Sequence, residues 1–431
     1  MASPNIITRR TNALASFGGY NSLTMRIAVV GGCPPNPEGE AHYTWCVVRE
    51  LAVLSSEPVT LLAHRPTKAP WNEPIADNLV IHRVTWGYHP LRRHLAFLHL
   101  KRWCDRIQPH VVHFQGPHKG LYGGVYGEPL LLLFRYLRRV GIPTVITLHS
   151  LWFREDFQLM AEERNLHAWK LRLLERHYYW YHLHLMRAAN QVNALVSGDS
   201  NPLIGEFLRE WCLDSAVICS EPHPCQPKVL SCQQVHSTKE SLGLSNKRIV
   251  LAFGFVRPDK GFDYLIKAMA PILRSDSRAM LLIAGEPRGR LGNMYANQLQ
   301  ALCHELEVGS QVLLELEYLP ESRLHLYLQA ADIVVIPYTR VMGASGPMHH
   351  ALSYGKPVVA SRVGQNRGME EVCLLVPPRN VESLQEALTA LLYETRTWET
   401  YHERSLNYAQ SHTWQHLAHR YLKDYQNIIR S

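Results

Sequence analysis

Residues 332–361 read DIVVIPYTRVMGASGPMHHALSYGKPVVAS and predict a strand, a glycine-bearing loop, a short helix and a second strand. Ile333 to Ile336 form an unbroken apolar, β-branched run, which is typical of a parallel strand covered on both faces. Gly355 suits the left-handed residue that ends a helix, and Pro357 prevents the helix from continuing. The stretch therefore predicts a βαβ unit in a parallel α/β sheet.

The turn into the short helix is a candidate anion site. Ser345 can cap the helix, and Pro347 suits its first turn, where a backbone N–H is not needed. The N–H groups of residues 345–348 then point outward at the positive end of the helix dipole, which favours a phosphate. Many βαβ units begin in this way without binding a ligand, so the local pattern alone leaves both interpretations open.

Strands and helices alternate through both halves of the chain, which predicts an α/β protein with two doubly wound parallel sheets. In the first half, apolar strands are predicted at residues 26–32, 59–63, 79–84, 111–114, 143–149 and 193–199. The second half repeats the plan from residue 248 and ends in a long helical pattern at residues 398–429. Ligands of such sheets bind beyond the carboxyl ends of the strands, where the sequence places Gly31, Gly39, His113, Gly116 and His149. No GxGxxG motif follows the first strand, so a dinucleotide site is not expected.

A second informative loop, residues 254–261, follows the first strand of the second half. It reads GFVRPDKG and places Arg257 and Lys260 three residues apart, just before a predicted helix. A guanidinium and an ammonium group beside a helix N-terminus suit a diphosphate. Taken alone, the pair also fits two solvated surface cations.

The composition indicates a globular protein of two domains with an anionic partner. The chain has 431 residues and a formal net charge of +8, which favours nucleotides, anionic phospholipid surfaces or nucleic acid. No basic-aromatic motif supports nucleic acid. Nine cysteines without a CxxC pair indicate free thiols in a reducing, cytoplasmic compartment. Cys212, Cys219, Cys225 and Cys232 lie near His223, but their spacing matches no common zinc pattern, so no metal site is expected.

Two basic helical segments are candidates for contact with a membrane surface. No segment has the ~20 apolar residues of a membrane span. Residues 91–103 are basic with apolar side chains at helical spacing, and residues 169–187 are basic and aromatic. Each segment fits either a crossover helix whose apolar stripe packs on the sheet or a helix whose basic face contacts an anionic membrane.

Together, the two loops resemble those of the retaining nucleotide-sugar glycosyltransferases of family 4, which have the GT-B fold. The most specific pieces are residues 254–261, 331–338 and 345–361, supported by residues 34–39, 111–114 and 147–149. The resemblance covers roughly residues 26–395. It implies two facing Rossmann-like domains with parallel sheets and a cleft between them. It also implies that the nucleotide-sugar is a substrate and that no metal or other cofactor is needed.

The resemblance implies how the donor diphosphate is held. Arg257 and Lys260 correspond to cations that neutralise the diphosphate as it leaves. Backbone amides of Ser345, Gly346 and Met348 complete this cradle.

The resemblance also implies contacts to the rest of the donor. Gly39 lets the backbone of the first domain approach the donor across the cleft. His149 corresponds to a histidine that contacts the donor sugar near the reacting carbon, and with Arg257 and Lys260 it forms the expected catalytic set. Tyr318 and Leu319 match the segment whose backbone meets the base.

The sequence departs from the family at two glutamates of the strand–helix loop. Met342 stands where one glutamate contacts the sugar, and His350 stands where the other contacts the ribose. An imidazole can donate or accept a hydrogen bond but carries no negative charge at neutral pH. Glu370 and Glu371 are the nearest carboxylates, which makes Glu370 an alternative sugar contact.

These observations predict a glycosyltransferase that moves a sugar, with retention, from a nucleoside diphosphate sugar to a glycan, lipid-linked saccharide or metabolite. Two alternatives stay open: a GT-B protein that binds a nucleotide or a partner without catalysis, and a nucleotide-sugar epimerase. The expected location is the cytoplasm, including peripheral contact with the inner face of an anionic membrane. The expected units are a disordered tail (1–24), an acceptor-side domain (25–215), a connector (216–245), a nucleotide-sugar-binding domain (246–400) and a C-terminal helix that crosses back to the first domain (401–431).

Overall fold

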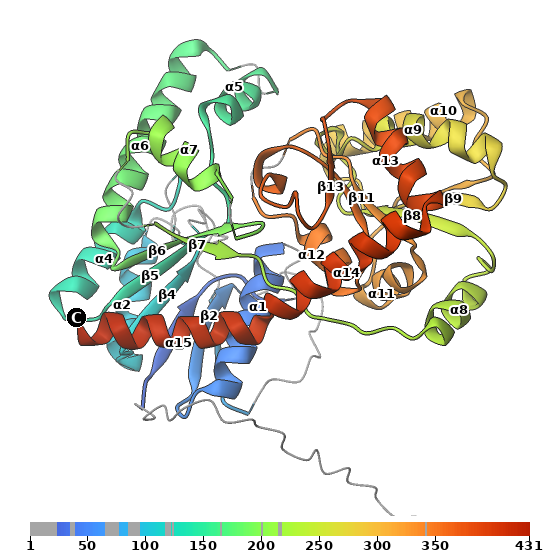
Figure 1. Ribbon diagram of the computed structural model, residues 1–431. Coiled ribbons are helices and arrows are strands. Elements are labelled where there is room, and N and C mark those ends of the chain that lie inside the picture. The colour runs from blue at the N-terminus through green and yellow to red at the C-terminus, as the bar shows by residue number, and fades with distance from the viewer. Residues whose placement is uncertain are drawn as a thin grey trace, which may run out of the picture.

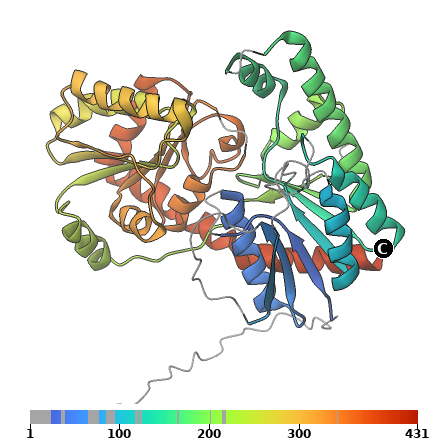
Figure 2. The ribbon, with the colours of Figure 1, turned by 180° about the vertical axis from the view of Figure 1, so that it is seen from behind.

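The computed structural model describes residues 24–34, 39–64, 77–84, 95–116, 122, 125–163, 166–199, 201–213, 218–340 and 343–431. Apart from Thr24, the predicted tail therefore lies outside the described residues, and so does Met342, the first of the two expected sugar contacts. Figures 1 and 2 show two α/β domains side by side, with the end of the chain passing from one to the other.

The first domain is built on a seven-stranded parallel sheet with the strand order β3-β2-β1-β4-β5-β6-β7. Strands β1, β4 and β5 are buried along their whole length, because helices cover both faces of the sheet. The bounds of the strands are β1 (Ile27–Val30), β2 (Val59–His64), β3 (Leu79–Val84), β4 (Val111–Gln115), β5 (Thr144–Leu148), β6 (Gln191–Val196) and β7 (Ile218–Pro222).

Strand β7 corrects one prediction. Residues 216–245 are expected to form the connector, but Ile218–Pro222 pairs in parallel with β6 as the edge of the first sheet. Its sequence, ICSEP, hides the strand because an edge position tolerates polar side chains and a proline. The crossing to the second domain therefore begins after Pro222.

The helices of the first domain form one layer on each face of the sheet (Figure 1). Helices α2 (Ala96–Ile107), α4 (Pro129–Arg139) and α6 (Ala168–Ala188) share a core with Ala28 and Val30 of β1. Helix α1 (Gly39–Leu54) packs on the alternate residues of the same strand, Ile27 and Val29, as the two-residue repeat of a strand requires. Helices α5 (Arg154–Glu163) and α7 (Leu203–Glu210) follow β5 and β6.

The second domain has a six-stranded parallel sheet with the strand order β10-β9-β8-β11-β12-β13. This order is that of a doubly wound Rossmann sheet, which confirms the predicted fold class. The strands are β8 (Arg248–Phe253), β9 (Ala279–Ala284), β10 (Val312–Glu315), β11 (Ile333–Ile336), β12 (Val358–Ser361) and β13 (Leu374–Val376). The helices are α8 (Cys232–Ser241), α9 (Phe262–Ser275), α10 (Gly289–Glu305), α11 (Glu321–Ala330), α12 (Gly346–Ser353) and α13 (Val381–Tyr393), with short 3-10 turns η4 (Pro258–Lys260) and η5 (Gly364–Asn366).

Residues 332–361 fold as their pattern predicts. Strand β11 leads through a loop into α12, and β12 returns in parallel beside β11. Gly355 has a φ of 63°, the left-handed conformation that glycine adopts at least cost and that ends the helix.

The end of the chain forms two helices where the pattern predicts one over residues 398–429. Helix α14 (Thr395–Ser411) packs on α12 and α13 of the second domain, and α15 (Trp414–Arg430) packs on α1 of the first. Thr413 separates them, because its side chain caps α15 by accepting a hydrogen bond from His416 N. Figure 1 shows the two helices running one after the other across the near side of both domains. In the described part of the chain, no helix combines the length and apolar content that a membrane crossing requires.

Candidate functional site

The two loops predicted to bind phosphate line one pocket of about 280 Å³. Arg257 and Lys260 come from the loop after β8, and Ser345 and Gly346 come from the start of α12. The strands β8 and β11 that lead into these loops are neighbours in the sheet, and doubly wound sheets bind ligands beyond such strand ends. Ser150 of the first domain also lines the pocket, so the site spans the interface between the domains.

Two contacts hold the cations at this pocket. Lys260 Nζ lies 3.7 Å from the centre of the Tyr338 ring in a cation–π contact. Arg257 donates two hydrogen bonds to the Asp259 carboxylate, at 2.8 and 2.6 Å. Burial raises the pKa of Asp259, but the hydrogen bonds from Arg257 and the charge of Lys260 outweigh burial, and the net pKa lies below its ordinary value. Asp259 is therefore charged at neutral pH and orients the Arg257 guanidinium.

Gly261 joins the loop after β8 to the loop after β11. Its φ is 65°, and an added Cβ would lie only 2.0 Å from the carbonyl oxygen of Pro337. Thr339 N also donates to Asp259 O at 2.9 Å. These backbone contacts fix the spacing between the cationic loop and the start of α12.

The N-terminus of α12 is capped as predicted, and this corrects the role expected of Met348. Ser345 Oγ accepts a hydrogen bond from Met348 N at 3.4 Å, and the Met348 side chain is fully buried. The Met348 amide is therefore engaged within the helix cap. A Cβ added to Gly346 would meet no atom within 4 Å, so the backbone at Gly346 borders open space and suits an anion better.

Contacts from the first domain complete the pocket. Ser150 forms an isolated antiparallel β-bridge with Gly343, and Arg340 Nε lies 3.8 Å from Asp156 Oδ1 of α5. Sequence reasoning missed Ser150, Arg340 and Asp259 as residues of this pocket. The sequence could have predicted Asp259, because it lies between the two predicted cations. The positions of Ser150 and Arg340 depend on how the domains pack.

His149 follows β5, directly before Ser150. Its Nε2 lies 2.8 Å from Oε1 of the buried Gln115, and the edge-to-face contact with the Tyr43 ring has a centroid distance of 4.8 Å. The first-domain histidine thus lies one residue from the pocket that contains both cations and the start of α12.

His350 lies on α12 and faces the first domain. Its ring centroid lies 5.6 Å from that of His42 on α1 and 6.5 Å from that of Phe253. Burial, followed by the nearby charges of His42 and His223, lowers the pKa of His350 to about 3. The ring is therefore neutral at physiological pH.

The other predicted contacts lie at separate places. Gly39 is the first residue of α1. Tyr318 is 64% exposed, whereas Leu319 packs partly against the core of the second domain. Glu370 accepts hydrogen bonds from Arg362 at 3.2 Å and from the Gly368 amide at 2.8 Å, so its carboxylate stabilises its own loop.

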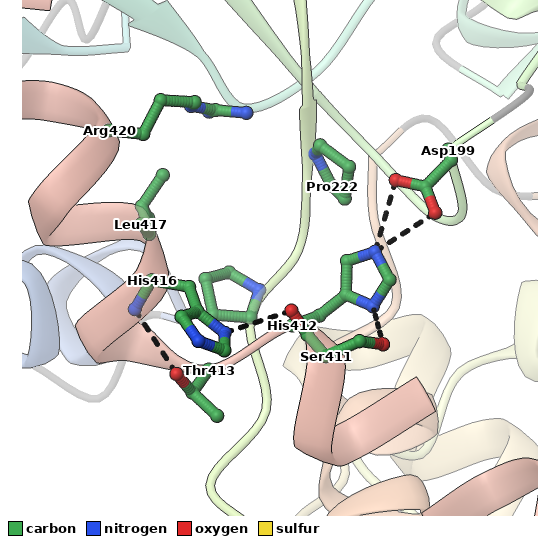
Figure 3. Close-up of a pocket in the computed structure, with 9 residues that line it drawn as sticks. Asp199, Pro222, Ser411, His412, Thr413, His416, Leu417 and Arg420 are labelled. Atoms are coloured by element: carbon green, nitrogen blue, oxygen red, sulfur yellow. Dashed lines mark hydrogen bonds and ion pairs between the residues drawn. The ribbon is translucent and has the colours of Figure 1, made fainter. Parts of the chain in front are cut away.

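A further pocket of about 230 Å³ lies at the joint between the domains (Figure 3). His412, between α14 and α15, lies 3.0 and 3.1 Å from the two carboxylate oxygens of Asp199. Arg420 is paired with the buried Glu221 at 3.3 Å. His412 and Arg420 are thus paired with carboxylates of the protein itself. We interpret this pocket as a structural contact between the domains and not as a second anion site. Among the described residues, no group of three or more His, Cys, Asp or Glu side chains has a metal-binding arrangement.

The whole described architecture is that of the GT-B class. A sucrose-phosphate synthase from Thermosynechococcus elongatus has a TM-score of 0.72 at 18% identity, with coverage of 94% of this chain and 99% of that chain. The Anabaena protein HepE in complex with UDP and glucose has a TM-score of 0.64 at 14% identity, with coverage of 94% and 99%. At such identities the likeness establishes the fold.

Sequence similarity is concentrated in the second domain. Residues 247–394 match the family described as glycosyl transferases group 1. The D-inositol 3-phosphate glycosyltransferase of Nocardia farcinica is 31% identical over 203 residues, which are 45% of this chain and 44% of that protein. The chain thus aligns with about half the length of this relative. The second domain is thus similar to the group 1 glycosyltransferases, and the chain has the GT-B fold.

Proposed function

We propose that this protein transfers a sugar from a nucleoside diphosphate sugar to an acceptor held on the side of the first domain, with retention of configuration. The observation that carries the proposal is the pocket in which Arg257, Lys260 and the start of α12 meet. Because the Anabaena relative is bound to UDP, UDP-sugars are the first donors to test.

The arrangement fits the charge that glycosyl transfer creates. When the bond between the anomeric carbon and the diphosphate oxygen breaks, the departing diphosphate keeps the electron pair and gains negative charge. Fixed cations and helix N–H groups stabilise such charge most when they are already oriented before the reaction. Asp259 orients Arg257 and Tyr338 holds Lys260, so both cations meet this condition. His149 acts from the opposite domain on the donor sugar.

A GT-B protein that binds a nucleotide without catalysis is the second candidate. It is favoured by His350, a neutral imidazole where the family has a carboxylate. The contacts of Glu370 to Arg362 and Gly368 favour it too, because they leave that carboxylate occupied within its loop.

One experiment separates the two candidates. The purified protein is screened with UDP-, GDP- and ADP-sugars for thermal stabilisation and for slow release of the free nucleoside diphosphate. A ligand at 100 times its Kd stabilises a protein by about 2.7 kcal/mol. Stabilisation with sugar release supports the transferase, and stabilisation by a nucleotide without release under any acceptor supports the binding protein. Absence of stabilisation by every nucleotide contradicts both.

The proposed location is the cytoplasm, with peripheral contact to an anionic membrane. All nine cysteines are free, which suits a reducing compartment. The membrane contact is assigned to the basic face, defined as the exposed side chains of α2, α4 and α6. Its exposed cations are Arg102, Arg106, Arg135, Arg138, Arg139, Lys170, Arg172, Arg176 and Arg187.

The basic face also exposes large apolar side chains. Trp169 is 62%, Leu173 is 60% and Trp180 is 43% exposed on α6. Within these three fully described helices, Asp105 is the one acidic residue classed as exposed, and it is paired with Lys101 at 2.6 Å. Exposed cations together with Trp and Leu are the combination that binds anionic bilayers.

Helix α6 also connects the basic face with the cleft. Its 21 residues span about 31 Å, whereas a six-residue strand spans about 20 Å. The helix leads into β6 and therefore begins on the side of the sheet where the strands end. Figure 1 shows it rising past the strands beside α5 and α7. A membrane on this face would place a lipid-linked acceptor near the cleft.

A further inference from the structure

A buried polar network lies behind His149 and connects strand β4 with the C-terminal helix α15. Gln115 ends β4 and is fully buried. Its side chain lies between His149, at 2.8 Å, and His113, at 3.4 Å. Tyr425 of α15 reaches His113 from the end of the chain, 312 residues away.

We infer that Gln115 is a positioning residue for His149, held in turn by His113 and by Tyr425 of the C-terminal helix. The inference rests on the proposed function, because it assumes that His149 acts on the donor sugar. It assigns a role in the site to Gln115 and to α15, which neither line the pocket nor belong to the sequence motifs.

The geometry leaves His149 little freedom. The Gln115 amide contacts the ring at Nε2, and the Tyr43 ring meets it edge to face. Both neighbours are themselves fixed. Tyr43 donates a hydrogen bond to the fully buried Glu221, which also accepts one from Tyr421 of α15 at 2.7 Å.

His113 fixes Gln115 from the other side. Its Nδ1 lies 2.5 Å from the Tyr425 hydroxyl and its Nε2 lies 2.9 Å from Thr147 Oγ1. Burial, followed by the charges of His149 and Arg420, lowers the pKa of His113 to about 3. The ring is thus neutral and bonded at both nitrogens, so it is a rigid support for the Gln115 amide.

Helix α15 therefore supplies part of the wall behind the site. Tyr421 and Tyr425 are fully buried and stacked at 5.8 Å between ring centroids. Burial raises the pKa of both hydroxyls far above neutrality, so they stay protonated: Tyr421 donates to Glu221, and the Tyr425 oxygen accepts from Nδ1–H of the neutral His113 ring. A first domain without α15 would lack both hydrogen-bond partners.

The test compares Gln115→Leu, Gln115→Glu and Tyr425→Phe with Tyr126→Phe, which removes a tyrosine hydrogen bond to Leu174 O at a different site of the same domain. Loss of the outer hydrogen-bond partner of a metal-bound imidazole typically costs 10-fold to 100-fold in activity, and we take this as the scale for Gln115. We expect Gln115→Leu to lower kcat by about that factor with the donor KM within about twofold. Tyr425→Phe changes kcat in the same direction but less, and Tyr126→Phe leaves it unchanged.

A second readout does not depend on turnover. The pKa of His149 is followed by NMR titration of its ring proton, assigned through its loss in His149→Gln. Gln115→Glu places a carboxylate against Nε2 and should raise that pKa by at least about one unit, moving the acid limb of the pH–rate profile upward with it. Tyr43 on α1 contacts this ring edge to face and His113 on β4 interacts with it electrostatically, and neither variant replaces them.

The outcomes separate the inference from the proposed function. If Gln115→Glu raises the pKa of His149 but the protein turns over no nucleotide-sugar, the contact between Gln115 and His149 is supported and the proposed reaction is overturned. An unshifted titration in Gln115→Glu, in a variant that melts normally, overturns the inference. Equal effects of Gln115→Leu and Tyr126→Phe on kcat would overturn it as well.

Discussion

Gly343 of the second domain and Ser150 of the first form an antiparallel β-bridge, and a Cβ on Gly343 would lie 2.4 Å from the carbonyl oxygen of His149. The loop that follows β11 is therefore seated against the backbone of the residue predicted to contact the sugar. This close approach joins the phosphate pocket to His149 through the backbone. The distance between the phosphate pocket and His149 therefore depends on Gly343.

Replacement of Gly343 by alanine should separate the domains at this point. A Cβ at 2.4 Å from a backbone oxygen must displace one of the two loops. We expect a larger radius of gyration by small-angle X-ray scattering and at least tenfold weaker nucleotide binding, since pocket residues from both domains move apart. Gly309→Ala is the control, because an added Cβ there meets no atom within 4 Å. Equal scattering from the two variants would contradict the role of the bridge.

Lys260→Ala should weaken donor binding more than His350→Ala does. The Lys260 ammonium lines the pocket, and a hydrogen bond to a charged group contributes about 1.5–3 kcal/mol, which is roughly a 10-fold to 100-fold effect on Kd. His350 is neutral and its ring faces His42 and Phe253, so we expect a change below about fivefold. Calorimetric titration with UDP and with the best UDP-sugar measures both.

The ranking of these two variants decides the phosphate assignment. If His350→Ala has the larger effect, the cationic loop is not the diphosphate site, and the diphosphate must be assigned to α12 instead. Arg257→Ala is a useful companion, because it removes the other cation and leaves Asp259 without its hydrogen-bond donor. We expect it to resemble Lys260→Ala in binding and to lower the melting temperature as well.

The stability of the fold should fall as the pH drops below about 6.5. Burial lowers the pKa of His182 to about 4 and that of His113 and His349 to about 3, whereas the unfolded chain titrates near 6.5. Between these values the unfolded state binds more protons, so stability is present above pH 6.5 and is lost toward the folded pKa. Each such histidine contributes a slope of up to about 1.4 kcal/mol per pH unit.

Urea unfolding between pH 7.5 and 5.0 measures this slope. His182→Gln removes one buried titrating group and should flatten the dependence by about one proton. His419→Gln, at an exposed position, should leave it unchanged. An unaltered slope in His182→Gln would show that His182 is not neutral in the folded state.

The sequence could predict the parts of the fold that rest on local patterns. The run Ile333–Ile336, the cap at Ser345 and the stop at Gly355 each have a short-range cause, and each occurs in the structure. The two cationic residues were also found locally, since Arg257 and Lys260 lie in one loop. These features need no knowledge of how distant segments meet.

The parts that were missed depend on packing over long distances or on weak local signals. Ser150 joins the pocket only because the domains meet there, and the contact of His113 with Tyr425 spans 312 residues. Strand β7 has a polar sequence and is recognisable only by its pairing with β6. The sequence did indicate the break before α15, because Thr413 is a good N-cap residue. The surrounding pattern otherwise predicts one continuous helix.

The basic face should bind vesicles that contain anionic lipid and release them when its charge is reversed. Each cation near an anionic surface contributes about 1 kcal/mol, so Arg135→Glu with Arg139→Glu should weaken binding by more than tenfold. Trp169→Ala with Trp180→Ala should weaken it too, because these rings supply exposed apolar area that can enter the headgroup region. Sedimentation with phosphatidylcholine vesicles in which about one third of the lipid is anionic phosphatidylglycerol measures both.

A matched control tests whether vesicle binding depends on the basic face or only on the net charge of the protein. Lys267→Glu with Arg290→Glu makes the same change in net charge at exposed positions on α9 and α10 of the second domain, away from the basic face. We expect this variant to sediment like the unsubstituted protein, since electrostatic attraction falls off within about 10 Å at 0.1 M salt. Equal loss in both charge-reversal variants would mean that only the total charge of the protein matters. Binding to pure phosphatidylcholine would remove the electrostatic argument, and no binding at low salt would remove the membrane contact itself.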